Sequence, residues 1–279
     1  MHVSTKKGVR MVSRALGVTA CAALFSMAAP VPALAQDSPV AVSAGVDFPS
    51  LYYYRGVRQE VDPKLTMQPW IDVGVPLMEG DGAIQSANLN VGSWNSWHSG
   101  SSGSGDGGPG FFYETDFYAT LGLGFSGWTL ATTYTAYTYP SPDFDAIHEL
   151  AFRGTASHMV APYVLIAQEF AEDEPGTYLE LGVGPSFALS DEEGGPTLAV
   201  PVKVGFDLND YYGGDTGYSF FSVGGTVNYP LPEQSWGTWG LRAGLEVLAL
   251  SETLEGFNFN GDDFSSTGFT GFGGLTFAF

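Results

Sequence analysis

Cysteine, basic residues and charge in general are scarce in this sequence. Its 279 residues include one Cys, and 10 Lys and Arg stand against 30 Asp and Glu. Charged residues make up 14% of the chain, where about 25% is usual for a globular domain. The single Cys excludes a disulfide framework and any Cys-rich metal site. Nucleic acid is not expected as a partner, because the phosphate backbone binds clustered Lys and Arg.

Long apolar runs are missing beyond the N-terminus, and amphipathic helical spacing is hard to find. No later stretch approaches the ~18 consecutive apolar residues of a membrane helix. The aromatic residues, 20 Phe, 14 Tyr and 6 Trp, are too numerous for a disordered chain. The chain is therefore predicted to fold, and to fold without many helices.

The N-terminus reads as a secretory signal peptide over residues 1–35. Its basic region contains no acid and four cations: Lys6, Lys7, Arg10 and Arg14. An apolar stretch over 15–29 and the small-x-small site Ala33-Leu34-Ala35 follow it. A lipid anchor at Cys21 is the alternative, although the apolar run continues well past this residue. Cleavage would leave a single domain over 36–279 with a net charge of −24, because all 30 acids and six of the ten cations remain.

Alternation with period two dominates the mature chain, which is typical of half-buried strands. Between 197 and 208, for example, Leu, Val and Phe alternate with Thr, Ala, Lys and Asp. About 12 such runs can be marked: 40–48, 65–76, 83–97, 111–125, 128–139, 146–157, 160–170, 177–188, 197–208, 217–229, 237–250 and 265–279. Most are longer than the ~5–6 residues usual in soluble sandwiches and match the ~9–11 residues of a tilted membrane strand.

The connections between these runs alternate between long and short. Long polar ones, such as Ser99–Gly110 and Ser251–Phe264, are followed by tight ones such as Glu79–Gly82 and Ser126-Gly127. This pattern and an even strand number are typical of outer-membrane barrels, whose periplasmic turns are short. Closure is expected because no free sheet edge is tolerated in hydrocarbon. The sequence thus predicts an all-β fold, an antiparallel transmembrane β-barrel of about 12 strands.

Aromatic residues near the strand ends are expected to form interfacial girdles. Trp97 and Tyr139 are predicted at the outer rim, and four aromatics at the inner one: Trp128, Trp236, Trp239 and Phe279. The last run alternates as far as the terminal Phe279. It resembles the assembly signal of Gram-negative outer-membrane proteins, which implies the outer-membrane assembly machinery as a partner.

The stretch Tyr52-Tyr53-Tyr54-Arg55-Gly56-Val57-Arg58-Gln59 resembles the N-terminal signature of the TorF-type family of outer-membrane porins. That signature reads roughly Tyr-x-Phe/Tyr-Arg-Gly-Ile/Val-Ser-Gln, and Arg58 departs from it. Gly92-Ser93-Trp94-Asn95-Ser96 is similar to the family's later Trp-x-Ser element. The resemblance implies an outer-membrane porin and no particular substrate. Six residues are candidates for this motif or for a constriction: Tyr52, Tyr54, Arg55, Gly56, Arg58 and Gln59.

Charged residues inside the predicted strands mostly share the parity of the small and polar residues. Charge on the lipid face costs up to ~2–4 kcal/mol at the midplane, so these side chains should face the lumen. The lumen-lining candidates are Asp72, Glu114, Asp116, Glu149, Arg153, Glu180, Lys203, Asp207, Arg242 and Glu246. Residues four apart on one strand lie about 13 Å apart, so direct ion pairs must be cross-strand. Of the remaining cations, Arg55, Arg58 and Lys64 either fold into the lumen or contact lipid phosphates.

Catalytic motifs are weak. The G-x-G-x-x-G match at Gly122–Gly127 precedes another alternating run and is interpreted as a hairpin rather than a nucleotide site. No metal-ligand spacing joins His98, His148 and His158, and neither a metal nor another cofactor is predicted. Ser96/His98 and Ser157/His158 are the nominal pairs for a lipid hydrolase, but no enzyme is expected.

These observations predict an outer-membrane porin of a Gram-negative bacterium, with membrane lipid, lipopolysaccharide and small solutes as partners. The predicted strands hold nine acids, the seven among the lumen candidates together with Asp47 and Glu169, against three cations. This excess predicts a preference for cationic or neutral solutes. Acid runs such as Glu172-Asp173-Glu174 and Asp262-Asp263 could bind divalent cations that bridge to lipopolysaccharide. A non-conducting structural or surface-binding barrel, a lipid-modifying barrel enzyme and a soluble secreted β-sandwich are the alternatives.

Overall fold

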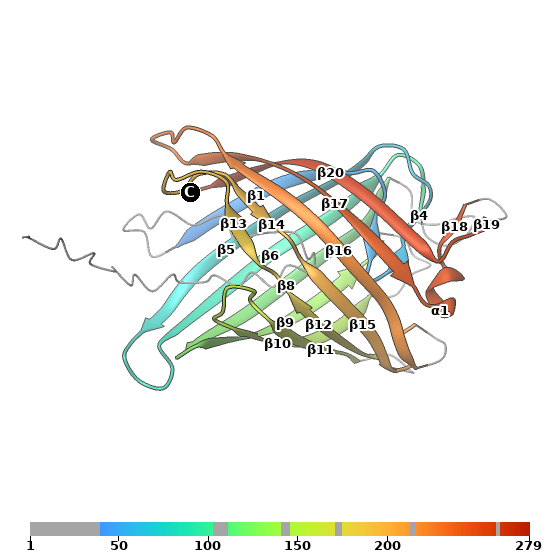
Figure 1. Cartoon of the computed structure of the whole chain (residues 1–279), viewed down its shortest axis with the longest axis horizontal. Coiled ribbons are helices and arrows are strands. Elements are labelled where there is room, and N and C mark those ends of the chain that lie inside the picture. Colours follow the sequence, from blue (N-terminus) through green and yellow to red (C-terminus); the bar gives the residue numbers. More distant parts are fainter. Residues whose placement is uncertain (1–39, 103–110, 141–145, 171–174, 213–215, 261–262) are drawn as a thin grey trace, which may run out of the picture.

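The fold is a single closed β-barrel (Figure 1). The computed structural model describes residues 40–102, 111–140, 146–170, 175–212, 216–260 and 263–279. The predicted signal peptide, residues 1–35, lies outside these ranges, as does Cys21.

Twelve long strands form the barrel wall, as the sequence predicts. Ten of them are unbroken: β1 (Ala41–Pro49), β5 (Thr66–Glu79), β6 (Ser86–His98), β8 (Phe112–Phe125), β9 (Trp128–Thr138), β10 (Ile147–Ala156), β11 (Tyr163–Phe170), β16 (Gly217–Pro230), β17 (Thr238–Leu250) and β20 (Thr267–Ala278). The other two are each interrupted once, as β12 (Thr177–Val183) with β13 (Ser186–Ala188), and β14 (Thr197–Ala199) with β15 (Val202–Asn209).

Every wall strand pairs with two antiparallel neighbours. The order runs through β15, β12, β11, β10, β9, β8, β6, β5, β1, β20, β17 and β16, and the β15–β16 pairing joins the ends. Where the first and last strands meet, the Val42 amide donates to the Phe279 carbonyl at 3.0 Å. Closure in one sheet confirms the predicted barrel and contradicts the two-layer sandwich.

Prolines cause the two interruptions. Pro185 separates β12 from β13 and Pro201 separates β14 from β15. Proline has no backbone N–H to donate to a ladder, but its carbonyl still accepts. Pro185 accepts from the Val200 amide at 2.9 Å, and Pro201 accepts from the Gly224 amide at 2.9 Å. The hydrogen-bonded ladder therefore continues past both prolines.

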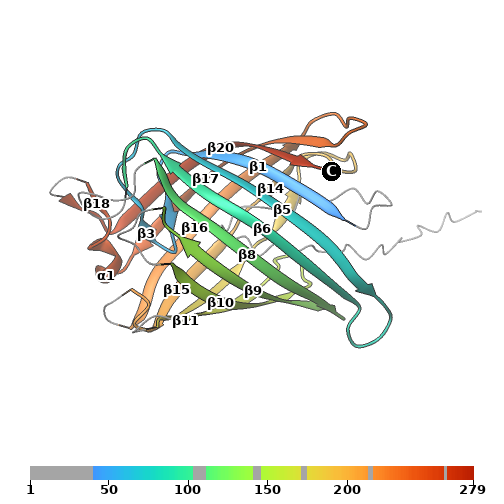
Figure 2. The same ribbon diagram turned by 180° about the vertical axis from the view of Figure 1, so that it is seen from behind.

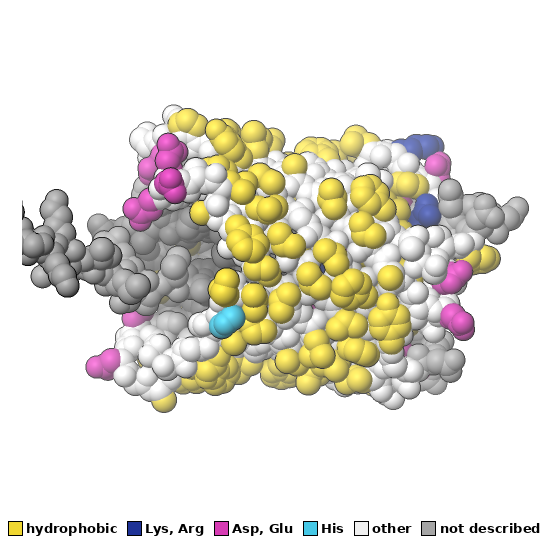
Figure 3. Space-filling view, in the orientation of Figure 1, with side chains coloured by type: hydrophobic (Ala, Val, Ile, Leu, Met, Phe, Trp, Pro, Cys, Tyr) yellow, Lys and Arg dark blue, Asp and Glu magenta, His cyan; other side chains and the backbone are white. Residues whose placement is uncertain are grey.

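The two faces of the wall differ as the alternation predicts. Apolar side chains such as Val91, Phe117 and Leu245 point outward and are about half exposed, while their neighbours Asn90 and Asp116 point inward and are buried. Figure 3 shows hydrophobic side chains spread over the middle of the wall and acidic ones gathered toward its two ends.

One end of the barrel, here called the terminus end, holds Val42 and Phe279. The opposite end, the loop end, holds six short elements: β2 (Tyr53–Tyr54), β3 (Val57–Arg58), β4 (Glu60–Asp62), β7 (Ser101–Ser102), β18 (Phe259–Asn260) and β19 (Asp263–Phe264). The four-residue helix α1 (Glu252–Glu255) lies there too (Figures 1 and 2). No helix in the described part of the chain is long and apolar enough to span a membrane.

The aromatic rims agree with the sequence except at Tyr139. Trp236 and Trp239 cluster at the terminus end, with ring centroids 6.0 Å apart, and Trp97 packs on Phe112 at the loop end. The prediction for Tyr139 is wrong: its hydroxyl donates inward to Glu114 at 3.4 Å. A buried carboxylate gives this hydroxyl a partner that the lipid side of the rim does not offer.

Gly92 in β6 is a position where the wall admits no side chain. A Cβ there would lie 2.4 Å from the Tyr118 ring and 2.5 Å from the Ile71 carbonyl oxygen. Gly92→Ala is expected to lower the unfolding free energy by about 1–3 kcal/mol through overpacking. Gly225→Ala is the control, since no atom lies within 4 Å of its Cβ position. Urea unfolding in detergent checks the difference, and equal stabilities of the two variants would contradict it.

Candidate functional site

Residues 50–65, the connection between β1 and β5, fold into the loop end of the barrel and are called the inward segment. Its strands β2 and β3 form a hairpin in which Tyr54 pairs with Val57. The two turn residues Arg55 and Gly56 have φ values of 46° and 85°. Positive φ at both turn positions is the type I′ arrangement, which matches the twist of a two-residue hairpin. The turn therefore places Arg55 at the tip of the hairpin.

Gly56 is required by space as well as by backbone conformation. A Cβ on this residue would lie 2.6 Å from Leu254 Cδ1 and 2.9 Å from Phe220 Cδ1. Leu254 belongs to α1 and Phe220 to β16, and both are completely buried. The hairpin tip thus packs between the barrel wall and α1, which together cover it.

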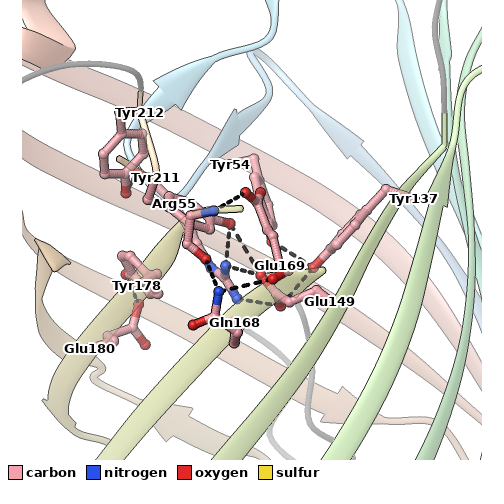
Figure 4. A network of polar contacts seen from close by, with 11 residues as sticks. Tyr54, Arg55, Tyr137, Glu149, Gln168, Glu169, Tyr178, Glu180, Tyr211 and Tyr212 are labelled. Carbon is pink, nitrogen blue, oxygen red and sulfur yellow. Dashed lines mark hydrogen bonds and ion pairs between the residues drawn. The ribbon is translucent and has the colours of Figure 1, made fainter. Parts of the chain in front are cut away.

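Arg55 forms a buried, bidentate ion pair with Glu149 on β10 (Figure 4). Its Nη1 lies 2.5 Å from Glu149 Oε2, and its Nη2 donates to Oε1 at 3.0 Å. Nη1 also donates to the Tyr211 hydroxyl. Burial is the largest single influence and by itself would lower the pKa of Arg55, but the Glu149 carboxylate and the hydroxyls of Tyr211, Tyr54 and Tyr137 together outweigh it, and the pKa is raised well above its usual value. Arg55 therefore stays charged inside the barrel.

Tyrosines surround this ion pair. The Arg55 guanidinium lies 4.4 Å from the centre of the Tyr178 ring, within the range of a cation–π contact. Glu149 accepts from the hydroxyls of Tyr137 and Tyr211 at 3.1 and 3.2 Å. The Tyr212 hydroxyl donates to the Arg55 carbonyl at 2.9 Å. Each group of the hairpin tip thus has a polar partner on the barrel wall or on the β15–β16 connection.

Hydrogen bonds fix further parts of the inward segment to different strands. The Tyr52 hydroxyl donates to Glu114 Oε2 on β8 at 3.0 Å. The Tyr54 and Tyr137 hydroxyls lie 2.7 Å apart, and Tyr113 donates to Gln59 Oε1 at 2.6 Å. These contacts hold the segment by polar groups that water could replace.

The other two cations of this stretch play different parts. Arg58 Nε and Nη2 donate to the carbonyls of Glu60 and Val61 at 2.6 and 3.1 Å, so this side chain stabilises its own segment. Lys64 lies 3.2 Å from Asp62, and both side chains are more than 60% exposed. Of the three cations considered together in the sequence, Arg55 is the one that enters the lumen.

Glu60 anchors the end of the hairpin. Its carboxylate, 1% exposed, accepts from the Tyr52 amide at 2.8 Å and from the Thr66 hydroxyl. Burial raises the pKa of Glu60, and the bonds from Thr66 and Tyr52 act against that shift. The folded state therefore favours its protonated form more than the unfolded chain does.

Eight of the ten lumen-lining candidates are buried, and the other two, Arg153 and Glu246, are half-buried. Two cross-strand ion pairs join wall residues: Lys203 with Glu246 at 3.0 Å and Arg242 with Asp47 at 3.2 Å. Arg153 instead covers the Tyr163 ring, 3.8 Å from its centre. The pairs four apart on one strand, such as Lys203 and Asp207, do not meet.

Several lumen carboxylates accept hydrogen bonds from neutral donors. Asp72 accepts from Asn90 at 2.6 Å and from Tyr118 at 3.1 Å. Glu180 accepts from Tyr163 and Tyr178, each at 2.7 Å. In addition, Asp207 accepts from the amides of residues 211 and 212 at 3.1 Å. The lumen thus keeps an excess of negative charge.

The candidate hydrolase pair Ser96 and His98 is in contact, with Ser96 Oγ 2.7 Å from Nε2. The Nδ1 of His98 lies 2.6 Å from Ser102 Oγ. Ser96 has no exposed surface, so a substrate would not reach it in this conformation. His158 Nδ1 accepts instead from the Val160 amide at 3.3 Å. Among the described residues, no group of three or more His, Cys, Asp or Glu is placed to hold a metal ion.

Sequence reasoning missed most partners of Arg55. Tyr137 and Tyr178 sit on wall strands β9 and β12, where an inward Tyr looks like any other lumen residue. The doublet Tyr211-Tyr212 in an otherwise polar connection was the one available signal. The acid runs at 172–174 and at Asp262 lie outside the described residues.

The chain is similar to two solved structures of autotransporter barrels. The chain is similar to the translocator domain of the autotransporter NalP from Neisseria meningitidis, with 13% identity, coverage of 88% of this chain and 90% of that one, and a TM-score of 0.45. It is also similar to the β-domain of the Bordetella autotransporter BrkA, with 13% identity, coverage of 86% and 99%, and a TM-score of 0.41. No family model and no curated protein matches the chain. Membership of the TorF-type family therefore stays a prediction, and what is established is a closed twelve-stranded antiparallel barrel.

Proposed function

We propose that the protein is an outer-membrane pore for small cationic or neutral solutes, held shut at its loop end by the inward segment. The observation that carries the proposal is the set of polar contacts between this segment and the barrel wall, above all the Arg55–Glu149 ion pair. A segment that only completed an apolar core would have no need of a buried charge. Polar contacts can exchange with water when the segment leaves this position, and its release would also uncover the aromatic cluster of Tyr52, Trp94 and Tyr113.

The outward face of the wall supports a membrane location. Large apolar side chains are exposed around the barrel, among them Phe117 at 56% and Leu245 at 50%. A continuous apolar belt of this kind is stable against lipid, and closure leaves no unpaired edge across it. By the usual orientation of such barrels the terminus end faces the periplasm and the loop end faces outward.

The excess of acidic over basic side chains in the lumen supports the proposed preference of the pore for cations. Asp72 and Asp207 accept from neutral donors, whereas Lys203 and Arg242 each pair with an acid and Arg153 stacks on a ring. A lumen lined by one sign of charge between low-dielectric walls concentrates the opposite ion.

Planar-bilayer conductance tests the proposal in a pair of proteins. The Tyr52 carbonyl accepts from the Gln59 amide at 2.9 Å, so residues 53–58 can be replaced by Asn-Gly without changing the ends of the hairpin. The wild type is expected to show low conductance, and the shortened variant steady conductance that favours cations. An insulating or anion-selective shortened variant would refute the proposal.

A non-conducting structural or surface-binding barrel is the second candidate. Tight packing inside the wall favours it, since Asn90, Thr120, Thr135 and Thr226 are each at most 1% exposed. The wild type and the shortened variant distinguish the two candidates. If the barrel is non-conducting, neither protein will conduct ions although both fold into vesicles.

We further propose that the barrel is not an enzyme, which agrees with the buried position of Ser96. Lipopolysaccharide and membrane lipid are its proposed surroundings. The assembly machinery is a proposed partner of β20, whose terminal Phe279 is 59% exposed. Unchanged lipid turnover in a His98→Ala variant would agree with this assignment.

A further inference from the structure

Asp116 on β8 is a lumen acid with an oxygen for which the described residues provide neither a hydrogen bond nor an ion pair, whereas Oδ1 of Asp47, which also lacks a hydrogen bond, lies 3.2 Å from Arg242 Nε. Its side chain is 1% exposed, and Oδ1 is buried with no hydrogen-bond donor within reach. Asp72, Glu114, Glu149 and Glu180 each accept at least two hydrogen bonds. A buried carboxylate oxygen left without a partner is costly, so something outside the chain is expected to meet it.

The charges around Asp116 point to a cation. Glu114 and Glu149 lie close enough for their charges to act on Asp116. Arg55 is the cation placed against this group, and both of its terminal nitrogens already bind Glu149. When ionised, these three carboxylates, each at most 4% exposed, and one guanidinium carry a formal charge of −2.

The potential ligands near Asp116 are oxygen atoms. Glu114 lies two residues from Asp116 on the same inward face of β8, and its oxygens accept from the Tyr52 and Tyr139 hydroxyls. Phenol oxygens keep lone pairs that can face a cation. Ca²⁺ takes six to eight oxygens and Mg²⁺ a strict octahedron. Among the described residues no group of three or more His, Cys, Asp or Glu is placed to hold a metal ion, so an ion here would have two acids and neutral oxygens as its ligands. A monovalent ion, which needs less charge and less order, fits this set.

We infer that Asp116 and Glu114 bind a monovalent metal cation, Na⁺ or K⁺, beneath the inward segment. The inference deepens the proposed cation-preferring pore and rests on it for its biological meaning. The ion would neutralise Asp116 and, through Glu114, brace Tyr52 of the inward segment. The site would thus strengthen closure of the loop end when the salt concentration is high.

Thermal unfolding of the full mature chain in neutral detergent tests the site. The melting temperature is compared in NaCl, KCl and choline chloride at equal ionic strength, because choline is a quaternary ammonium ion that carboxylate oxygens cannot coordinate as they do a bare metal cation. For the wild type, a rise of roughly 3–6 °C is expected in Na⁺ or K⁺ at tenfold the half-saturating concentration. Asp116→Asn should lose this response and should melt in choline chloride no lower than the wild type.

Asp72→Asn is the matched control. Asp72 is also a buried wall acid, but Asn90 and Tyr118 satisfy it. This variant should melt lower in all three salts and keep the response to Na⁺ or K⁺. Should Asp116→Asn fail to fold, Glu114→Gln tests the same site and should lose the response.

Two results would overturn the inference. One is a wild type that melts equally in all three salts, which would mean that a proton rather than a metal ion neutralises Asp116. The other is an Asp116→Asn protein that keeps the response. Neither readout requires conduction, so failure of the pore proposal and failure of the cation site can be told apart.

Discussion

Replacing Arg55 with Ala is expected to open the barrel. The change would leave Glu149, which is 1% exposed, as a buried carboxylate without its cation. Breaking one partner of a buried ion pair costs about 3–5 kcal/mol. That cost disappears if the inward segment leaves its seat and water reaches Glu149. A change of about 3 kcal/mol alters an equilibrium ratio roughly a hundredfold, so the open fraction, measured as mean conductance per molecule, should rise by that order.

The controls for Arg55→Ala come from the same segment and from its partner. Lys64→Ala removes a cation whose pair is exposed, where an ion pair contributes at most about 1 kcal/mol, so its conductance should match the wild type. Adding Glu149→Gln to Arg55→Ala removes the stranded charge, and the double variant should return toward closure. Equal conductance of Arg55→Ala, Lys64→Ala and the wild type would contradict a latch at Arg55.

The barrel wall could be predicted from the sequence because its outward and inward faces impose opposite demands on alternate residues. The run at 111–125, for example, corresponds to β8, with Phe117 outward and Asp116 inward. The interruptions at Pro185 and Pro201 were less visible, because the alternation of side chains continues across both. Alternation of apolar and polar residues shows which face of a strand each side chain occupies. It does not show whether the backbone hydrogen bonds of that strand are continuous.

The candidate site was only partly predictable. Tyr52, Tyr54 and Arg55 stood out as a motif, yet the sequence left open whether they enter the lumen or meet lipid. Their position depends on partners far away in the chain, such as Glu149 and Tyr211, which share no spacing with them. The same reason explains the wrong rim position of Tyr139, whose partner Glu114 lies on another strand.

Placing Arg at position 91 on the outer wall is expected to cause the largest loss of stability in a membrane. Val91 lies near the middle of β6, pairs with Val73 and Ala119 on its two neighbours, and is 45% exposed on the outward face. Arg at the bilayer midplane of a barrel costs about 2–4 kcal/mol and near the interfaces about 0–1 kcal/mol. Val91→Arg should therefore lower the unfolding free energy in phospholipid vesicles by that larger amount and reduce insertion during refolding.

Met159→Arg is the matched control, because Met159 lies in the turn between β10 and β11 at the terminus end and is 77% exposed. Urea titration in vesicles and heat-modifiable migration on a denaturing gel measure both variants. If the apolar belt faced water, as in a secreted soluble barrel, Arg at 91 would be hydrated and tolerated as well as Arg at 159. A deficit confined to Val91→Arg, and larger in vesicles than in detergent, would instead locate the lipid contact on the outward face of β6.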